Sequence, residues 1–319
     1  MTSAACLPAG SPVSNIRLVG CDGGQTFHLY GDKAGDEGVE LAWDGLEELY
    51  EPPVRIIERT PIRMDGGVLR AVKTAIMEPV VTLVIHGDHV NPFGIVDGAI
   101  REALSFELDP YYENSTLARI EWQTTESTRF IEVVLTAGTK YDAEHVPGDH
   151  PRRNWWQWEL HLKAYMPFWQ EDDVLVPVEF EAAGTKKAII SNPSGVDMEH
   201  KYVGTAATWT FPDNTWSGPP WRREPGGMFP DRKLTYPDID PVENVGITVD
   251  YSPDQIPVRD AFDHNMVAQM PVQGDYPKNV IPRFCQPVEI EITATNVPAG
   301  GAAVVIHQVR RFRRAWGRV

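Results

Sequence analysis

The sequence of 319 residues has few cysteines and no long apolar run. Cys6, Cys21 and Cys285 lie far apart and form no CxxC or Cys/His pattern, so neither a disulfide framework nor a zinc site is predicted. No window approaches the roughly 18 consecutive apolar residues that a membrane-spanning helix needs. Residues 1–15 lack the basic start and the apolar stretch of a signal peptide, so none is expected.

Basic side chains are also scarce, because 29 Lys and Arg residues face 45 Asp and Glu residues and the formal net charge is −16. Sequence-independent binding to nucleic acid depends on Lys and Arg side chains that neutralise phosphates. The charge therefore argues against a nucleic-acid-binding protein. It fits a soluble protein from whose surface polyanions are repelled.

Motifs of catalysis are missing as well: the chain has no GxSxG, no P-loop, no GxGxxG that opens a helix and no HExxH. The "HGDH" segment at 86–89 and the "EHVPGDH" segment at 144–150 are interpreted as solvated turns rather than metal sites. Glu289 and Glu291 alternate with apolar residues, which places them on the polar face of a strand. We therefore predict no catalytic, cofactor-binding or metal-binding residue.

Proline and glycine, by contrast, are plentiful, with 27 and 26 residues spread along the chain. This distribution is typical of many short strands joined by turns. Residues 16–31 predict a hairpin around "DGG", and the β-branched segment 79–87 predicts a buried strand. One helix is expected over about 92–107, with Asn91 as its N-cap and with Ile100 and Leu104 facing a sheet while Arg101 faces outward.

The segment "WWQWELHLKAYMPFW" at 155–169 concentrates six aromatic side chains in fifteen positions. It invites interpretation as a sugar platform, but its residues alternate strictly, as in a strand with one buried face. The set expected on the buried face is Trp156, Trp158, Leu160, Leu162 and Ala164. Glu159 is expected on the opposite face, exposed or at a subunit contact, and the sequence after the strand indicates the edge of a domain.

The second half consists of short apolar segments around a Pro-, Gly- and Trp-rich excursion between Pro212 and Pro241. Its pattern predicts an antiparallel β-sandwich with long loops. The whole chain is thus expected to be mainly β, with one domain over 1–170 and a second over 171–319.

The C-terminal "RRFRRAWGRV" is the one basic cluster, and its candidate contact residues are Arg310, Arg311, Arg313 and Arg314. Two interpretations stay open. The strip docks on an acidic surface, such as that of a neighbouring copy, or it is an exposed terminal strand that offsets local negative charge.

The order of several landmarks resembles the distal tail proteins, or minor tail proteins, of long-tailed phages, especially those of actinobacteria. The matching segments are "LVGCDGGQTFHLYG", "GVEL", "LYEPPV", "WWQWELHLKAYMPFW", "ISNPSGVDMEHKYVGTAATWTFPD", "VGITVDYSPDQIPVRDA" and "RRFRRAWG". The resemblance implies a structural protein of the virion tail tip that forms a homohexameric ring. Its implied neighbours are the tail tube, the tape-measure protein, the tip hub and other minor tail proteins.

The resemblance also implies a tail-tube-like β-barrel or sandwich with one helix, followed by a galectin-like β-sandwich. It carries no catalytic residues and no cofactor. Because DNA passes through such a ring, an acidic or neutral channel wall is expected. An alternative function is a carbohydrate-binding adhesin that contacts a host surface glycan; its candidate contacts are Trp216, Trp221 and Tyr236, with Trp209, Arg222, Asp231 and Asp238 in the same region. An enzyme is the least favoured class.

Overall fold

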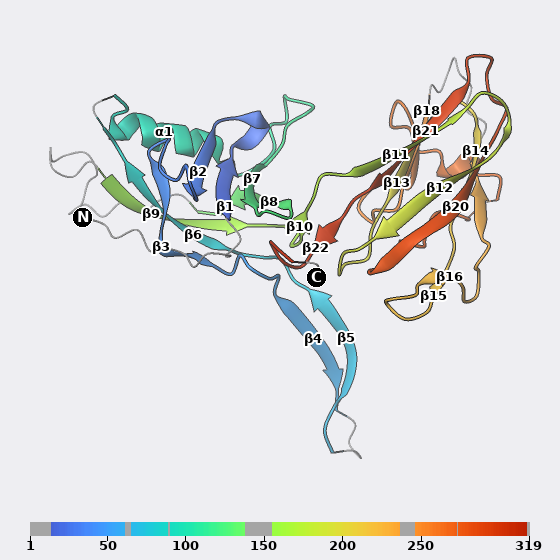
Figure 1. Ribbon diagram of the computed structural model, residues 1–319, viewed down its shortest axis with the longest axis horizontal. Helices are drawn as coiled ribbons and strands as arrows, with labels where there is room; N and C mark the ends of the chain where they lie inside the picture. The colour runs from blue at the N-terminus through green and yellow to red at the C-terminus, as the bar shows by residue number, and fades with distance from the viewer. Residues whose placement is uncertain are drawn as a thin grey trace. The chain divides into compact units, whose positions relative to one another are not determined.

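The computed structural model describes residues 14–60, 65–88, 90–137, 155–236, 246–272 and 274–317. The chain divides into two compact units: Met1–Trp169 with Arg313–Gly317, and Gln170–Phe312 with Arg318–Val319. The expected division into 1–170 and 171–319 does not include this return of residues 313–317 to the first unit. Within the described residues both units are built mainly from antiparallel strands, and a single α-helix is present (Figure 1).

Seven described strands of the first unit form one antiparallel sheet in the order β2-β1-β7-β8-β9-β6-β3. Their bounds are β1 Asn15–Val19, β2 Thr26–Tyr30, β3 Val39–Glu47, β6 Val80–His86, β7 Ala118–Gln123, β8 Thr128–Leu135 and β9 Trp155–Lys163. The hairpin expected over 16–31 is present as β1 and β2, joined by a 3-10 turn at Cys21–Gly23. Among the described strands the sheet does not close into a barrel.

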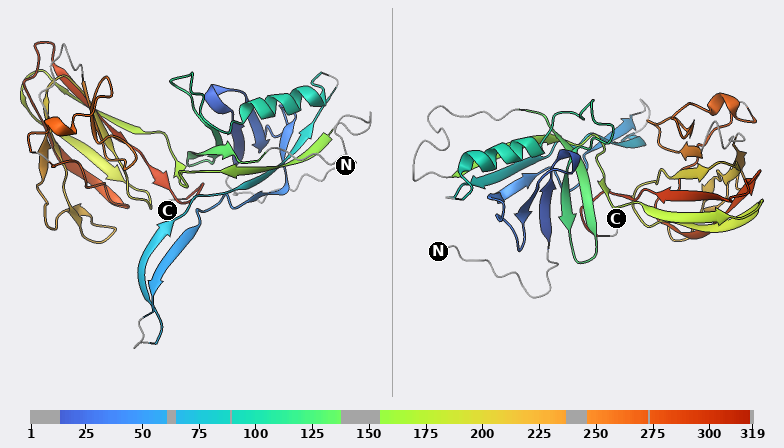
Figure 2. Two further views of the ribbon diagram at one scale, coloured as in Figure 1. Left: turned by 180° about the vertical axis from the view of Figure 1, so that it is seen from behind. Right: turned by 90° about the horizontal axis from the view of Figure 1, so that it is seen from above.

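Strand β9 confirms the alternation in the aromatic segment. Trp158, Leu160, Leu162 and Ala164 are buried, Trp156 is half-buried, and the Glu159 side chain is 60% exposed. The helix α1, Phe93–Ala103, lies along one face of the sheet beside β6 (Figures 1 and 2). The guanidinium carbon of Arg101 lies 4.6 Å from the centroid of the Trp158 ring. The aromatic segment is therefore a core strand under the helix.

The helix differs from its prediction at both ends. It ends at Ala103, not near 107, because Leu104 is extended and the backbone N–H of Leu135 on β8 donates to Ser105 O at 3.0 Å. The N-cap is Pro92, without a side-chain cap, so the expected Asn91 cap is wrong. Asp88 instead accepts hydrogen bonds from the backbone N–H groups of Val90 and Asn91. Ile100 and Leu104 are buried as expected, whereas Arg101 is half-buried.

The second unit is a β-sandwich, as its sequence pattern predicts. One described sheet has the order β11-β21-β13-β18-β19, and the other has the order β12-β20-β14-β17. The bounds are β11 Val174–Phe180, β12 Gly184–Asn192, β13 Lys201–Thr205, β14 Thr208–Pro212, β17 Lys233–Thr235, β18 Gly246–Asp250, β19 Val258–Asp260, β20 Cys285–Thr295 and β21 Ala302–Gln308. Shorter elements are β10 Trp169–Gln170, β15 Trp216–Ser217, β16 Glu224–Pro225, β22 Arg311–Phe312 and the 3-10 turn Val267–Gln269.

Aromatic rings dominate the core between these two sheets. Tyr202 and Phe211 stack with ring centroids 4.2 Å apart, and Trp209 stacks on Phe211 at 5.8 Å. The indole N–H of Trp209 donates to Thr205 O at 2.8 Å, which satisfies its polar atom in the interior. Rings of this size bury roughly 150–250 Å² each. The second unit therefore has a core of its own.

Candidate assembly surfaces

Strands β4, Val54–Arg59, and β5, Val68–Thr74, form a separate two-stranded sheet in the first unit. Neither strand pairs with any other described strand, and all their side chains are exposed except Thr74, which is half-buried. Figure 1 shows this β4–β5 hairpin standing clear of the main sheet of the first unit. An isolated two-stranded sheet is at best marginally stable in water. The hairpin is thus an element that needs a partner surface.

The register of the hairpin sorts its side chains onto two faces. Ile56 is opposite Val72, and both side chains lie on the same face as Val54. Ile56 is 60% exposed and Val72 is 51% exposed. This face therefore presents a contiguous apolar patch, the kind of surface that natural proteins usually cover or interrupt with charge.

The other face carries like charges directly opposite each other, since Arg55 pairs in register with Lys73. Such a cross-strand pair is destabilising by itself. Neither residue forms an ion pair with any residue that the structure describes. The two strands together carry four basic side chains and one acidic side chain, in a chain with a net charge of −16. A surface that is both acidic and partly apolar would complement this hairpin.

The C-terminal arginines have partners inside their own chain. In the second unit, Arg311 forms an ion pair with Glu199, and Arg310 donates to Ser191 Oγ at 3.3 Å. In the first unit, Arg314 forms an ion pair with Glu51. Arg313 is half-buried and forms no ion pair with a described residue. Docking of this C-terminal strip on an acidic surface stays a prediction. Arg313 is now its main candidate, because Arg310, Arg311 and Arg314 have partners within the chain.

Residues 313–317 are an integral part of the first unit. The buried Arg129 side chain donates to the backbone oxygens of Arg314 and Gly317, at 2.9 and 2.6 Å. The Trp316 ring packs between Tyr50 and Trp122, with centroids 4.5 and 4.7 Å away. These contacts hold residues 313–317 against the sheet.

Two rings of the predicted glycan platform are not available to a ligand. Tyr236 and Trp209 are fully buried, so the expectation that Tyr236 contacts a glycan is wrong. The backbone N–H of Tyr236 donates to Trp209 O at 2.8 Å, which extends the β14–β17 pairing and turns the ring into the core beside Phe211. Burial raises the pKa of the Tyr236 hydroxyl well above its ordinary value.

The remaining predicted glycan residues lie in different environments. Trp216 is half-buried against the core of the second unit, whereas Trp221 is 77% exposed. Arg222 is exposed, and Asp231 lines a cavity of this unit. Asp238 lies outside the described residues. These residues do not form a common aromatic platform.

The segments considered for chemistry have structural partners. His86 lies 2.9 Å from a carboxylate oxygen of Glu40, while His89 and residues 144–150 lie outside the described residues. Glu289 and Glu291 form ion pairs with Lys187 and Lys233 at 2.8 and 2.9 Å, and the hydrogen bond from Lys233 lowers the pKa of Glu291.

Across the described ranges no three His, Cys, Asp or Glu side chains gather as metal ligands. Cys21 and Cys285 are free thiols, and burial raises the pKa of Cys285 to about 11. No helix in the described part of the chain has the length and apolar character to cross a bilayer.

Known proteins resemble this chain in both sequence and fold. The sequence is 25% identical to the minor tail protein Gp27 of Mycobacterium phage L5, over 95% of this chain and 98% of that protein. The fold matches the Dit protein (gp 19.1) of phage SPP1, described as a paradigm of the hub adsorption apparatus in phages that infect Gram-positive bacteria. That match has a TM-score of 0.51 and 10% identity and covers 92% of this chain and 98% of the SPP1 chain.

A chain of the phage P2 baseplate in its activated conformation also matches, with a TM-score of 0.47 and 8% identity, over 93% and 98% of the two chains. No protein-family model matches the sequence. Along almost its whole length the chain therefore resembles a phage minor tail protein in sequence and a phage Dit protein in fold, which confirms the resemblance to distal tail proteins that its landmarks predicted.

Proposed function

We propose that this chain is a structural protein of a phage tail tip, where six copies form a ring between the tail tube and the tip hub with its receptor-binding apparatus. The full-length sequence match to a minor tail protein and the Dit-like fold support this assignment. The neighbours in this proposal are the tail tube, the tape-measure protein and other minor tail proteins. No residue is assigned a catalytic role, a metal or a cofactor.

The main structural support for a ring comes from the β4–β5 hairpin. Its apolar face, with Ile56 and Val72, and its facing cations, Arg55 and Lys73, have no partners among the described residues of their own chain. In a ring of identical subunits, one surface of each copy is covered by a different surface of the next copy. Each hairpin would lie against the acidic surface of a neighbour, where its cations gain counter-charges and its apolar face leaves water.

The charge of the chain makes such local complementarity necessary. A net charge of −16 per copy becomes −96 for six copies, which repel one another. Salt screens this repulsion only beyond roughly 8–10 Å at physiological ionic strength. Contacts with a local excess of positive charge, as on the hairpin, would offset the repulsion where subunits meet.

Mass measurement after gel filtration, by light scattering, tests the ring. Six copies of the 35.7 kDa chain give a species of about 215 kDa. Ile56→Asp is expected to shift the protein to monomers that remain folded and still unfold cooperatively on heating. Ile189→Asp is the matched control, because Ile189 is 57% exposed on a strand of the second unit. A monomer at the highest attainable concentration, or equal assembly by both variants, contradicts the role of the hairpin.

Imaging of intact tails tests the place of the ring. The chain is expected at the tail tip, with an acidic or neutral channel wall, because a lining of Lys and Arg would hold DNA phosphates in salt-dependent contacts. A position along the tail shaft or in the capsid contradicts the assignment.

A further inference from the structure

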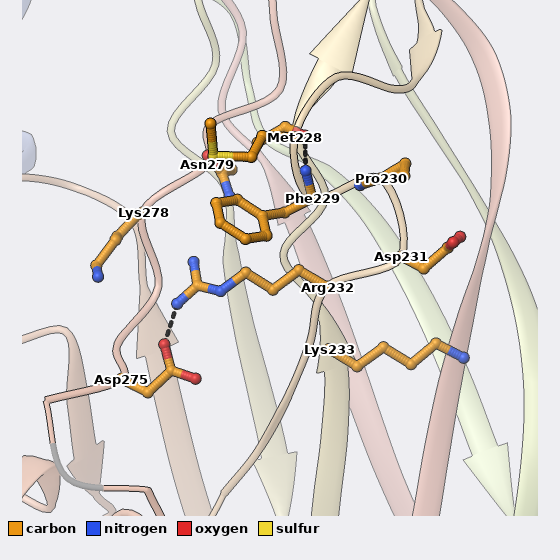
Figure 3. Close-up of a pocket in the computed structure, with 10 residues that line it drawn as sticks. Met228, Phe229, Pro230, Asp231, Arg232, Lys233, Asp275, Lys278 and Asn279 are labelled. Atoms are coloured by element: carbon orange, nitrogen blue, oxygen red, sulfur yellow. Dashed lines mark hydrogen bonds and ion pairs between the residues drawn. The ribbon is translucent and has the colours of Figure 1, made fainter.

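A cavity of about 860 Å³ opens in the second unit. It lies between residues 228–233, which lead into β17, and residues 275–279 (Figure 3). Its volume falls within the roughly 300–1,000 Å³ of typical small-molecule sites. Asp231 of the predicted glycan region lines this cavity, whereas Trp216, Trp221 and Tyr236 do not, so the cavity lacks the aromatic rings of the platform expected from the sequence.

The floor of the cavity is a fixed polar network. The Arg232 guanidinium forms ion pairs with Asp213 and Asp275 and donates to Tyr276 O at 3.2 Å. The Asp213 carboxylate is fully buried and accepts hydrogen bonds from the backbone N–H groups of Lys278 and Asn279, at 3.1 and 2.9 Å. These bonds join the two segments and hold planar polar groups in set orientations before any ligand arrives.

The charges of the cavity lining nearly cancel, because Arg232, Lys233 and Lys278 are basic while Asp231 and Asp275 are acidic. Burial raises the pKa of Asp213, while its backbone hydrogen bonds and Arg232 act in the opposite direction. Lys233, also in the lining, forms an ion pair with Glu291. The lining therefore suits a neutral polar ligand better than a highly charged one.

An exposed aromatic ring stands over this floor. Phe229 is 53% exposed, and Figure 3 shows its ring above the Arg232 side chain. Its backbone is fixed, because its N–H donates to Thr215 Oγ1 and its carbonyl accepts from Thr215 N–H, both at 3.0 Å. A large, exposed apolar side chain on a fixed backbone offers a contact to the apolar face of a ligand.

Lys278 and Asp231 are two further charged residues of the cavity lining. The Lys278 ammonium lies 4.5 Å from the centroid of the Tyr276 ring, and Asp231 lines the cavity on the side of residues 228–233. Neither Lys278 nor Asp231 forms an ion pair with a residue in the described ranges. One supplies hydrogen-bond donors and the other supplies acceptors, which is what a set of hydroxyl groups requires.

From this arrangement we propose that the cavity binds a neutral hexopyranose unit, of the kind found in surface polysaccharides. The C–H face of the sugar ring would lie on Phe229, and its hydroxyl groups would reach Lys278 and the carboxylates of the cavity. A polyanionic glycan is disfavoured by the acidity of the whole chain. The proposal does not depend on ring formation, because every residue of the site belongs to one unit of one chain.

Saturation-transfer NMR with the full chain tests this site. The probes are methyl α-D-glucopyranoside, methyl β-D-galactopyranoside and methyl α-D-mannopyranoside, each titrated alone. At least one is expected to bind with a Kd on the order of 1 mM. Phe229→Ala and Lys278→Ala are each expected to weaken that binding about tenfold or more.

Trp221→Ala is the matched control, because Trp221 is an exposed aromatic residue of the same excursion that does not line the cavity. This variant should bind as the unmodified chain does, and unchanged thermal unfolding should confirm that all three variants are folded. Absence of binding by all three sugars overturns the proposal. So does unchanged binding by Phe229→Ala, or loss of binding by Trp221→Ala.

Discussion

In the strand pairs β4–β5 and β12–β20, successive side chains point to opposite faces in the same way. The two pairs differ in what their side chains contact. In the β12–β20 pair, Ala188 and Ile290 face the core, while Lys187 forms an ion pair with Glu289 on the outer face. In the β4–β5 hairpin, no core of described residues covers the apolar face, where Ile56 and Val72 are exposed, and the cations oppose each other. The first pair is complete within one chain, whereas the hairpin has the composition of a surface made for another molecule.

The largest expected effect contrasts a core ring with a hairpin side chain. Trp158→Ala removes a buried ring beneath α1 and should lower the free energy of unfolding by about 3–5 kcal/mol. Ile56→Asp should change it by no more than about 0.5 kcal/mol. Urea unfolding of monomers measures both. A similar large loss in both variants would mean that the hairpin packs against its own chain.

The core strand was readable from the sequence, because alternation depends only on neighbours along the chain. That pattern placed Trp158 inside and Glu159 outside, and it also gave the antiparallel strands of the second unit. The end of α1 was not readable, because the backbone bond between Leu135 and Ser105 that accompanies it joins residues far apart in sequence.

The hairpin and the cavity were also missed, for related reasons. In "VRIIER" two isoleucines are adjacent and charges flank them, so no single face stands out before the register with β5 is known. The "DGG" at 65–67 was the one local turn signal. The cavity depends on Arg232, Asp213 and Asp275, which only the fold brings together. Tyr236 was misplaced because a Pro- and Gly-rich excursion hides the short strand β17.

A second prediction concerns the stability of the second unit at low pH, which depends on the buried side chain of His200. Burial lowers the pKa of His200 from 6.5 to about 3, and its ring stacks on Tyr251 with centroids 4.0 Å apart. Because the unfolded chain takes up a proton near pH 6.5 and the folded chain does not, stability is full above that pH and falls as the pH drops towards 3. The loss between pH 7 and pH 5 should be about 2 kcal/mol.

The comparison with His200→Phe isolates this contribution, since the substituted ring can stack but cannot take up a proton. Denaturant unfolding at pH 7 and pH 5 should show a smaller loss for the variant than for the unmodified chain. Equal losses would show that the carboxylates, and not His200, set the acid sensitivity.

A third prediction compares arginines that are paired within the chain with Arg313, which forms no ion pair with a described residue. Arg311→Glu places two carboxylates together at Glu199 and should destabilise the second unit by about 1–3 kcal/mol. Arg313→Glu should change stability by no more than about 0.5 kcal/mol. If the C-terminal strip contacts an acidic neighbour, Arg313→Glu should still weaken assembly in light scattering. Unchanged assembly would favour the alternative, in which the strip only offsets local charge.

The substitution with the smallest expected effect on folding, Lys73→Glu, is the sharpest test of the hairpin's role in assembly. Lys73→Glu replaces the like-charged pair with Arg55 by an attractive pair, which should stabilise the hairpin of an isolated monomer by about 0.2–1 kcal/mol. The same change adds negative charge to a surface that is proposed to meet an acidic neighbour, so assembly should weaken although the monomer gains stability. Hydrogen exchange of the β4–β5 amides reports the first effect, and light scattering reports the second. Lys73→Gln, which removes the repulsion without adding charge, should fall between the two. If Lys73→Glu strengthens both the hairpin and the assembly, the partner surface is not acidic, and the charge argument for a second copy of this chain is wrong.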